Sequence, residues 1–326
     1  MRTLVTGSTG HLGEGLLRIL RGRGGPAVGL DLLASPFTDF VGSIEDRSLL
    51  RGALKDVRAV IHTATLHKPH VRTHTRQAFV DTNIAGTLAL LEESVAAGVE
   101  RFVFTSTTSA FGRALSPPSG APAAWVTEDV ASIPKNIYGA TKTAAEDLCE
   151  LVHRDEGLPC LILRTSRFFP EDDDSAAIRD RYEGDNAKVN ELLYRRADLE
   201  DIVSAHLAAV ERAPRRGFGK YIVSATTPFA REDVRALRDN APSVVRRLFP
   251  HYEQLYADRG WTMFPSVDRV YDSARASQDL QWTPRWTFAY ALTRLAEGKV
   301  AKSELALTVG AKGYHAESFE GEPYPT

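Results

Sequence analysis

Short apolar runs alternate with amphipathic segments through the first half of the chain. Residues 3–6 form an apolar run of strand length, and residues 12–20 then carry leucine and isoleucine at helical spacing. Further runs of strand length are found at residues 27–31, 59–62, 101–105 and 158–164. Helices are expected to begin at residues 43–46 and to extend from about residue 75 to residue 97, just before Gly98. Apolar strands that alternate with helices predict a parallel sheet covered on both faces.

The later part of the chain is less regular. Residues 198–212 have a helical pattern and residues 220–223 read as a strand, with shorter helices expected at 233–238, 244–249 and 288–295. The acidic run at residues 171–174 predicts a solvated loop. The last twenty or so residues are rich in glycine and proline and have little periodicity, which predicts an extended tail that is packed on the surface or frayed.

Composition narrows the class of protein. The chain has 326 residues, of which 43% are hydrophobic and 25% charged, and its formal net charge is -2. These values are typical of an ordinary globular protein and give no indication of nucleic-acid or membrane-surface binding. Cys149 and Cys160 are expected to be small buried side chains. No apolar window is long enough to cross a bilayer and no secretion signal is apparent, so we expect a cytoplasmic location.

A glycine-rich turn lies between the first predicted strand and the first predicted helix. Gly7, Gly10 and Gly13 allow the backbone to approach a pyrophosphate whose charge the helix N-terminus stabilises. Asp31 ends the second predicted strand, where a carboxylate can bind both hydroxyls of an adenosine ribose and repel a 2′-phosphate. The turn therefore predicts a dinucleotide cofactor, NAD in preference to NADP. An alternative role for Asp31 is to cap a turn.

Tyr138 and Lys142 stand one helical turn apart and so share one helix face. A tyrosine hydroxyl has a reference pKa of about 10, and a nearby positive charge favours the phenolate. An isolated pair with this spacing is more often exposed and inert. Because this pair follows a dinucleotide-type turn, it predicts an acid/base pair at a catalytic site.

Several ordered motifs together resemble the extended short-chain dehydrogenase/reductase family, the NAD-dependent epimerase/dehydratase group. The resemblance covers roughly residues 1–296. It rests on Thr6-Gly7-Ser8-Thr9-Gly10-His11-Leu12-Gly13, Val60-Ile61-His62-Thr63-Ala64, Asn83-Ile84-Ala85-Gly86-Thr87, Phe104-Thr105-Ser106-Thr107, Phe111-Gly112 and Tyr138-Gly139-Ala140-Thr141-Lys142. Later segments at residues 201–205, 268–272 and 280–282 resemble the same family.

This resemblance implies an α/β fold with a Rossmann-type doubly wound parallel sheet and a smaller, mixed α/β substrate-binding C-terminal region. The implied NAD-binding domain consists of residues 1–165 with about 197–226. The substrate-binding region and C-terminal tail then take about 166–196 and 227–326.

The resemblance also implies a set of cofactor-binding residues. These are Gly7, Thr9, Gly10, His11, Leu12, Gly13, Asp31, Ser43, Ile44, Thr63, Ala64, Thr65, Asn83, Thr105, Tyr138 and Lys142. His11 and Leu12 would contact the pyrophosphate through their backbone. Ser43 stands where the family has an aspartate on the adenine side, and it could equally be a helix cap, with Asp46 completing a capping box. Asn83 would brace the site or be a satisfied core amide.

The family's catalytic hydroxyl, counted back from Phe111-Gly112, falls on Thr107, with Ser106 and Thr108 open as one-residue alternatives. The implied catalytic set is Thr107, Tyr138 and Lys142. Tyr138 would exchange a proton with the substrate, and Lys142 would hold the nicotinamide ribose. The long proline-containing loop between Thr107 and Tyr138 is expected to cover the substrate.

Two departures from the family pattern predict a small substrate. Nucleotide-sugar members carry diphosphate-binding arginines where this chain has Tyr194 and Pro265, and the segment between Arg164 and Asp201 is short. A free sugar, sugar acid or polyol derivative is therefore expected. The predicted substrate-binding residues are His67, Thr107, Thr108, Arg167 and Asn190. The arginines available for an acidic group are Arg167, Arg179, Arg181 and Arg195. No metal is expected, because His67, His70 and His74 lack supporting ligands.

The sequence thus predicts an NAD-dependent enzyme that transfers hydride at a secondary alcohol or ketone, as a dehydrogenase or an epimerase. The alternative is a nucleotide-sugar epimerase or dehydratase, with Arg195 or Arg196 as the clamp. A catalytically silent NAD-sensing protein is a third reading, although such a protein would not need the Tyr138–Lys142 pair. The resemblance also suggests a homodimer.

Overall fold

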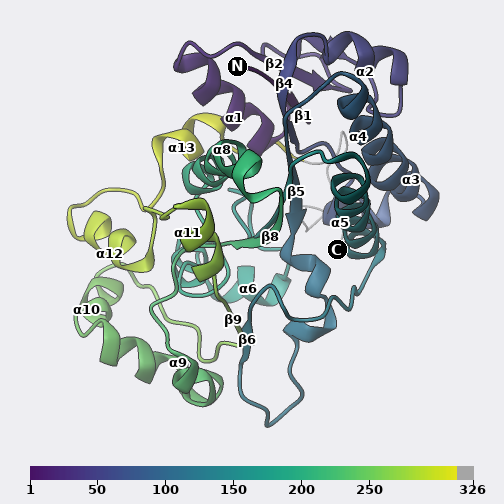
Figure 1. Ribbon diagram of the computed structural model, residues 1–326. Helices are drawn as coiled ribbons and strands as arrows, with labels where there is room; N and C mark the ends of the chain where they lie inside the picture. Colours follow the sequence, from purple (N-terminus) through teal and green to yellow (C-terminus); the bar gives the residue numbers. More distant parts are fainter. Residues whose placement is uncertain (314–326) are drawn as a thin grey trace.

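The computed structural model describes residues 1–313 and has one central sheet of seven parallel strands (Figure 1). The strands are β1 Arg2–Thr6, β2 Ala27–Asp31, β3 Phe40–Val41, β4 Val57–His62, β5 Arg101–Thr107, β7 Cys160–Thr165 and β8 Phe218–Val223, in the order β3-β2-β1-β4-β5-β7-β8. The prediction of a doubly wound, Rossmann-type parallel sheet is confirmed.

Helices cover both faces of this sheet (Figure 1). One face packs against α1 His11–Gly22, α8 Leu199–Arg216, α11 Ala274–Leu280 and α13 Glu304–Val309. The other face packs against α2 Arg47–Ala53, α4 Gly86–Ala96 and α5 Ile137–Glu156, and α3 Arg76–Val80 packs against α5. Covering both faces removes the apolar strand side chains from water, which is the main stabilising term for such a sheet.

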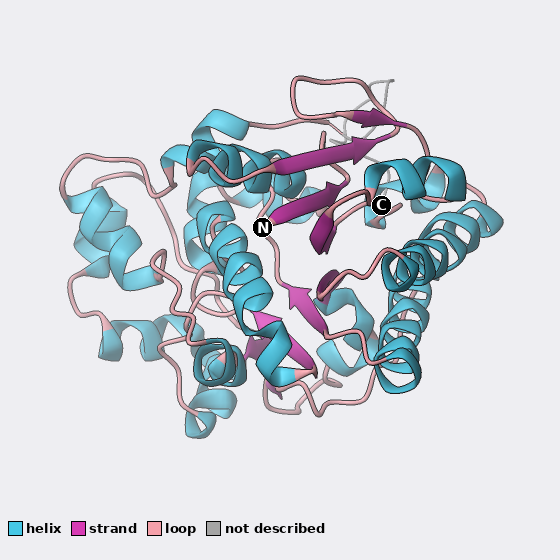
Figure 2. Ribbon diagram, turned by 45° about the horizontal axis from the view of Figure 1, so that its top comes forward, coloured by secondary structure: helices cyan, strands magenta, loops and turns pink. Residues whose placement is uncertain are grey.

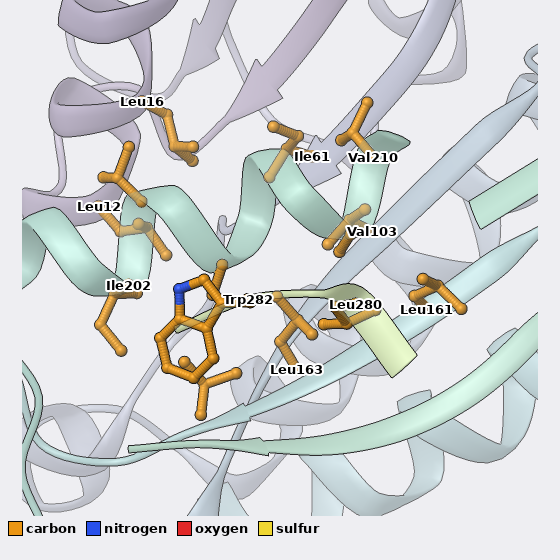
Figure 3. Packing of buried hydrophobic residues seen from close by; sticks show 14 of the residues in the cluster. Leu12, Leu16, Ile61, Val103, Leu161, Leu163, Ile202, Val210, Leu280 and Trp282 are labelled. Carbon is orange, nitrogen blue, oxygen red and sulfur yellow. The ribbon is translucent and has the colours of Figure 1, made fainter. Parts of the chain in front are cut away.

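The core on the α1–α8 face shows why the amphipathic pattern of the first helix matters. Leu12 and Leu16 of α1 lie against Ile202 of α8 and against strand residues such as Ile61 (Figure 3). Leu16 and Ile61 are fully buried. This packing holds the N-terminus of α1 at the carboxyl end of β1.

The strand order creates a switch point between β1 and β4. From β1 the chain moves outward to β2 and β3, and then returns to form β4 on the opposite side of β1. The loops that follow β1 and β4 therefore leave the same edge of the sheet in opposite directions. In open parallel sheets, ligands bind at this position.

Some predicted boundaries need correction. The helix expected from residue 43 begins at Arg47, because the Asp46 carboxylate accepts hydrogen bonds from the backbone N–H groups of Ser48 and Leu49. The Ser43 hydroxyl instead accepts from Glu45 N–H at 3.1 Å, so Ser43 does not cap the helix. The long helix expected at residues 75–97 is present, with a π-helical turn at Asp81–Ala85 between α3 and α4.

A group of helices lies to one side of the sheet (Figure 2), and these helices carry a second apolar core. It is built largely from α7 Gly184–Glu191, α9 Val234–Leu248, α10 Tyr252–Ala257 and α12 Phe288–Ala296. The two short helices expected at residues 233–238 and 244–249 correspond to the two halves of α9, which the non-helical backbone of Asn240 divides two residues before Pro242. This core is separate from the cores on the two faces of the sheet. We therefore propose the two parts inferred from the sequence, an NAD-binding domain of residues 1–165 with about 197–226 and a substrate-binding region of about 166–196 and 227–326.

Smaller elements connect the two parts. The strands β6 Ala124–Val126 and β9 Arg269–Tyr271 pair in parallel, and α6 Ala176–Arg181 precedes α7. Turns of 3-10 helix lie at Lys68–Arg72, Thr108–Phe111, Arg113–Leu115 and Arg231–Asp233. The predicted tail begins with the helix α13, and the rest of that prediction, residues 314–326, falls outside the described residues. Across residues 1–313, no helix is long and apolar enough to cross a membrane.

Candidate active site

The glycine-rich turn after β1 is closely packed. A Cβ atom on Gly13 would lie 1.9 Å from the Gly7 carbonyl oxygen, so only glycine allows the helix to begin this close to the strand. Gly10 is the N-cap of α1, and no side chain caps this helix. The first-turn N–H groups are therefore available for an anionic ligand, and the turn fits a dinucleotide pyrophosphate.

Asp31 lies at the end of β2 beside this turn. Its Oδ2 accepts hydrogen bonds from both the backbone N–H and the hydroxyl of Thr9, each at 2.9 Å, and its Oδ1 accepts from Leu33 N–H at 3.1 Å. The carboxylate thus braces the glycine-rich turn while remaining half-exposed. Ile44, expected near the adenine, is buried in the core and packs against Gly86 at the start of α4.

The loop after β4 is fixed to β1 by threonine side chains. The Thr63 hydroxyl donates to the Thr6 carbonyl at 2.7 Å, and the Thr6 hydroxyl accepts from the backbone N–H groups of Thr63 and Ala64. These bonds place the predicted cofactor-binding residues 63–65 next to the glycine-rich turn, as the switch point requires.

Asn83 connects this loop to two helices. Its Oδ1 accepts from the Thr65 hydroxyl and from Leu66 N–H, both at 2.9 Å, while its Nδ2 donates to the Leu66 carbonyl and the Thr141 hydroxyl. Both the oxygen and the nitrogen of the Asn83 amide are hydrogen-bonded and the side chain is buried, so Asn83 holds the loop in place. The geometry favours the bracing role over direct contact with a cofactor.

Thr105, another predicted cofactor contact, is engaged elsewhere. Its hydroxyl is bonded at 2.9 Å to Nε2 of His206, a buried residue of α8. Burial lowers the pKa of His206 to about 4, so this imidazole stays neutral. Its Nδ1 lies 2.8 Å from the Ile202 carbonyl, which fixes the proton on Nδ1 and makes Nε2 the acceptor.

Thr107 and Tyr138 meet at the carboxyl end of β5. Tyr138 forms a side-chain hydrogen bond with Thr107, whose Oγ1 also accepts from Ser109 N–H at 3.1 Å. This approach depends on Gly139, where a Cβ atom would lie 2.9 Å from the Ser109 carbonyl oxygen. The structure also separates the alternatives for the hydroxyl: Ser106 donates to buried Glu146 at 2.5 Å, whereas Thr107 and Thr108 line a cavity.

The predicted effect of Lys142 on Tyr138 is corrected by the structure. Burial raises the pKa of Tyr138 to about 12, and the hydrogen bond with Thr107 opposes this rise only in part. Burial also lowers the pKa of Lys142 to about 7, with Cys149 and Glu146 opposing. Desolvation penalises both charged forms, so it outweighs the expected phenolate stabilisation. Tyr138 is a neutral phenol in this structure.

The cavity beside Tyr138 has a volume of about 270 Å³. The hydroxyl-bearing residues in its lining include Thr107, Thr108, Ser109 and Tyr138, and its apolar walls include Leu115, Phe168 and Phe169. Leu115 belongs to the segment between Thr107 and Tyr138, so part of that segment borders the cavity as expected. Four basic residues complete the lining, namely Lys68, Arg167, Arg195 and Arg269.

Carboxylates of the chain lie among these basic residues. Arg167 bonds to Asp173 at 2.8 Å and to Asp174 at 3.2 Å, while Lys68 also pairs with Asp174. Asp174 lines the cavity, and its two cationic partners hold its pKa well below the usual range despite burial. The acidic run predicted to be a solvated loop is therefore folded onto the cavity.

Sequence reasoning missed Lys68 and Arg269. Arg269 reaches the cavity from β9. This strand pairs with β6, which lies more than 140 residues earlier in the sequence, so no local pattern of residues predicts the position of Arg269. Lys68 follows the β4 loop, one position after the predicted His67, which also lines the cavity. The basic run at residues 195–196 was identified, but its two arginines point to different places. Arg195 lines this cavity and Arg196 a second one.

Three predicted contacts lie away from the cavity. Asn190 is fully buried, and its side chain donates to the Thr262 carbonyl at 2.9 Å and accepts from the Tyr256 hydroxyl at 2.8 Å, so the prediction that it binds substrate is corrected. Arg179 and Arg181 belong to the short helix α6 and do not line the cavity. In residues 1–313, no three His, Cys, Asp or Glu side chains are grouped as a metal site would require.

A doubly wound sheet with an uncapped, glycine-rich helix start and a Thr–Tyr–Lys group beside a polar cavity defines a dinucleotide-binding protein of the short-chain dehydrogenase/reductase type. Comparison with protein-family models agrees. Residues 3–218 match the NAD dependent epimerase/dehydratase family, and the chain belongs to this family. The predictions of family, of an enzyme of this family and of NAD as its cofactor are confirmed.

Individual relatives match over part of their length. The chain is 32% identical over 170 residues to a UDP-glucose 4-epimerase of Rhizobium meliloti (strain 1021), covering 49% of this chain and 50% of that protein. It is 35% identical over 156 residues to the sterol demethylase protein B of Methylococcus capsulatus (strain ATCC 33009 / NCIMB 11132 / Bath), covering 45% of each. The matches thus span about half the length of these curated relatives.

The fold extends further than these sequence matches. A short-chain dehydrogenase/reductase superfamily protein from Agrobacterium tumefaciens, solved with bound NAD, superimposes with a TM-score of 0.65. The alignment covers 91% of this chain and 96% of that one at 24% identity. At this identity the similarity establishes the fold alone.

Proposed function

We propose that the protein is an NAD-dependent oxidoreductase or epimerase that transfers hydride at a secondary alcohol or ketone of a small sugar, sugar acid or polyol derivative. The observation that carries this proposal is the cavity at the carboxyl edge of the sheet, which contains Thr107 and Tyr138 together with four basic side chains. Hydroxyl groups suit a carbinol or carbonyl oxygen, and the basic groups suit an acidic substituent on the same molecule.

Each side chain of the site has its own role in the proposed reaction. Bound NAD supplies a hydride acceptor or donor at its nicotinamide ring. Thr107 holds the substrate oxygen, and Tyr138 exchanges the proton of that oxygen at its Oη. Because Tyr138 is a neutral phenol at rest, the group is ready to donate a proton to a ketone, and oxidation of an alcohol first requires loss of that proton. The Lys142 amine provides the contact for the nicotinamide ribose.

Two features favour a sugar acid within the substrate class. Three arginines and a lysine line a cavity of about 270 Å³, and arginine is the side chain best suited to a planar carboxylate. This volume lies near the lower end of the roughly 300–1,000 Å³ range of small-molecule pockets. A single sugar-sized ring fits this space better than a nucleotide diphosphate does.

The alternative is a nucleotide-sugar epimerase or dehydratase. The relatives named UDP-glucose 4-epimerase favour it. The burial of Tyr194 at one family diphosphate position, together with Pro265 at the other, counts against it. A catalytically silent NAD-sensing protein is a third candidate, against which the contact between Tyr138 and Thr107 counts.

The test is a screen for NADH formation with free sugars, uronic and aldonic acids, polyols and nucleotide sugars, with Tyr138→Phe and Tyr290→Phe variants in parallel. The proposal expects stoichiometric NADH, or epimerised product, from a small sugar-type compound, and loss of both in Tyr138→Phe alone. Turnover of nucleotide sugars only would establish the alternative. Tight NAD binding without any turnover would favour the sensing protein.

We also propose that the protein forms a homodimer, on the resemblance alone, and that it acts in the cytoplasm, as expected from its sequence. Light scattering of the purified chain tests the dimer, and a monomer at micromolar concentration would refute it.

A further inference from the structure

A second cavity of about 240 Å³ lies on the far side of Phe168 and Phe169 from Tyr138. It is bounded by α7, by the segment around Trp261, by Trp286 and by residues 295–302 after α12. Phe168 and Phe169 line both cavities, and their ring centroids are 4.3 Å apart. None of the residues assigned to the proposed reaction lines this second space.

One part of the lining of the second cavity is apolar. The indole N–H of Trp261 donates to Glu183 at 2.6 Å and that of Trp286 to Glu200 at 2.7 Å. Both indole N–H groups are thus satisfied by carboxylates outside the cavity lining. Trp286 is only 4% exposed, with Tyr290 and Arg294 packed against its ring, so the apolar lining available to a ligand is formed mainly by Trp261. Val189 and Leu192 extend this apolar lining along α7. Such a lining favours a ligand with an apolar ring.

The charged groups of the lining are unbalanced. Five basic side chains line the cavity, Lys188, Arg196, Arg259, Lys299 and Lys302, against two carboxylates, Asp185 and Asp198. Asp185 pairs with Lys302 at 2.8 Å, and Asp198 is used by the backbone N–H groups of Glu200 and Ser303. Within residues 1–313, neither carboxylate forms an ion pair with the two cations on the α7 side of the cavity, although the charge of Asp185 favours the charged form of one of them, Lys188.

Arg196 and Lys188 are those two cations. The Arg196 side chain is only 8% exposed; its Nε donates to Glu191 and its Nη1 to the Phe169 carbonyl. Its Nη2 has no hydrogen bond within residues 1–313, and Glu191 is shared with Arg167 and Arg195. The nearest carboxylate to Lys188 Nζ is Asp172 at 3.8 Å. Burial and the like charges of Arg196 and Lys302 lower the pKa of Lys188.

We propose that this cavity binds a small aromatic anion, one planar ring bearing a single carboxylate or phosphate, with the ring on the apolar lining formed by Trp261, Val189 and Leu192 and the anionic group on Lys188 and Arg196. The unpaired guanidinium N–H groups and the ammonium supply charge-assisted hydrogen bonds to that group. The site is independent of the proposed reaction. Because Phe168 and Phe169 line both cavities, a ligand in the second cavity lies next to residues that also line the active-site cavity.

Binding of benzoate and of phenyl phosphate to the full-length protein, measured by isothermal titration calorimetry, tests the proposal. Benzamide keeps the ring without the charge, while acetate and inorganic phosphate keep the charge without the ring. We expect saturable binding of at least one aromatic anion, at least tenfold weaker binding of benzamide, and no saturation with acetate or inorganic phosphate. Equal binding of benzamide, or of the ringless anions, overturns the assigned chemistry.

Variants locate the site. Lys188→Met is expected to weaken binding of the aromatic anion at least fivefold, and Trp261→Leu to weaken it similarly. Lys220→Met is the matched control, because Lys220 is another half-buried lysine with carboxylates at 3.3 and 3.8 Å, on the distant strand β8. Binding should persist with saturating NAD. Unchanged binding in Lys188→Met, or competition with NAD, would overturn the proposed location, and absence of any saturable binding would overturn the site itself.

Discussion

The Lys142 ammonium lies 3.9 Å from the centroid of the Phe104 ring, in a position that is almost fully buried. Within residues 1–313, no group forms a hydrogen bond with its Nζ, and Glu146, one turn further along α5, is already bonded to Arg164. A lysine held in this way is a costly residue for folding. It is therefore better explained by a role in ligand binding than by a role in stability.

Lys142→Met is expected to stabilise the protein without ligands. Burial lowers the pKa of Lys142 in the folded state to about 7, well below its value of 10.5 in the unfolded chain, so the folded state resists protonation. The penalty is fully present below pH 7 and fades as the pH rises toward 10.5, because the unfolded chain then also loses its proton. We expect a gain on the order of 2 kcal/mol at pH 6–7 that is nearly absent at pH 10.

Denaturant unfolding at pH 6, 7, 8.5 and 10 measures this gain, with Lys135→Met as an exposed-lysine control. A gain that is independent of pH would show that packing, and not the ammonium, is responsible. Loss of stability at pH 6 would mean that Lys142 has a buried partner in solution.

The neighbouring hydroxyls at the end of β5 give a second prediction. Thr107 bonds to Tyr138, whereas Thr108 lines the same cavity and forms no side-chain hydrogen bond with that phenol. Thr107→Val is expected to lower kcat at least a hundredfold, the scale of general acid/base and orientation effects, while Thr108→Val changes kcat less than tenfold. Steady-state kinetics on the substrate found in the screen measures both. A larger loss in Thr108→Val would move the catalytic hydroxyl by one residue.

These residues also show what local sequence can predict. The glycine-rich turn, the helix that carries Tyr138 and Lys142, and the alternating strands are encoded by near neighbours, and all are present in the structure. Thr107 could be narrowed only to a run of three hydroxyls. The structure removes Ser106 from this run, because Ser106 faces α5 and bonds to Glu146, whereas Thr107 and Thr108 both line the cavity.

Features that depend on distant packing could not be predicted. Arg269 enters the cavity because β9 pairs with β6, and Asp174 does so because two cations hold it there. Asn190 was assigned to the substrate, yet its helix face turns toward Thr262 and Tyr256. The pKa of Tyr138 followed burial, which spacing along a helix does not reveal.

The buried Glu146–Arg164 ion pair is expected to contribute less to the free energy of unfolding than either single substitution suggests. Arg164 Nη2 lies 2.6 Å from Glu146 Oε2, and both side chains are at most 5% exposed. Glu146→Gln or Arg164→Met should cost about 3–5 kcal/mol, because each leaves an unpaired buried charge or polar group. The double variant Glu146→Met/Arg164→Met should cost clearly less than the sum. Urea unfolding of the four proteins measures the cycle, and additive losses would mean that the two residues do not interact.

Asp31→Ala should relax the preference for NAD over NADP at least tenfold. The carboxylate lies where a 2′-phosphate would meet it, so its removal eliminates a repulsion. Asp31 also holds Thr9, so loss of packing is a competing cause. Thr9→Val removes the hydroxyl bond but keeps the carboxylate and should leave discrimination unchanged. Equal relaxation in both variants would assign the effect to the shape of the turn.

Asp174→Asn tests whether the chain's own carboxylate occupies the anion site of the cavity. Asp174 pairs with Lys68 and bonds to Arg167 at 3.2 Å, and all three side chains line the cavity. An acidic substrate must therefore compete with Asp174 for these cations. Removal of its charge should lower KM for a sugar acid roughly tenfold, the size of about 1.4 kcal/mol, while KM for a neutral polyol stays unchanged.

The neutral substrate separates electrostatics from a general opening of the cavity, because an opened cavity would change both KM values together. Asp172→Asn is the matched control, since Asp172 lies in the same acidic run but is largely exposed and outside the cavity lining. The difference between the two substrates should also shrink in high salt, because screening weakens the interaction that Asp174 competes for. If Asp174→Asn raised KM for the acid instead, Asp174 would be positioning Arg167 and Lys68 for the substrate, and the view of a competing internal carboxylate would be abandoned.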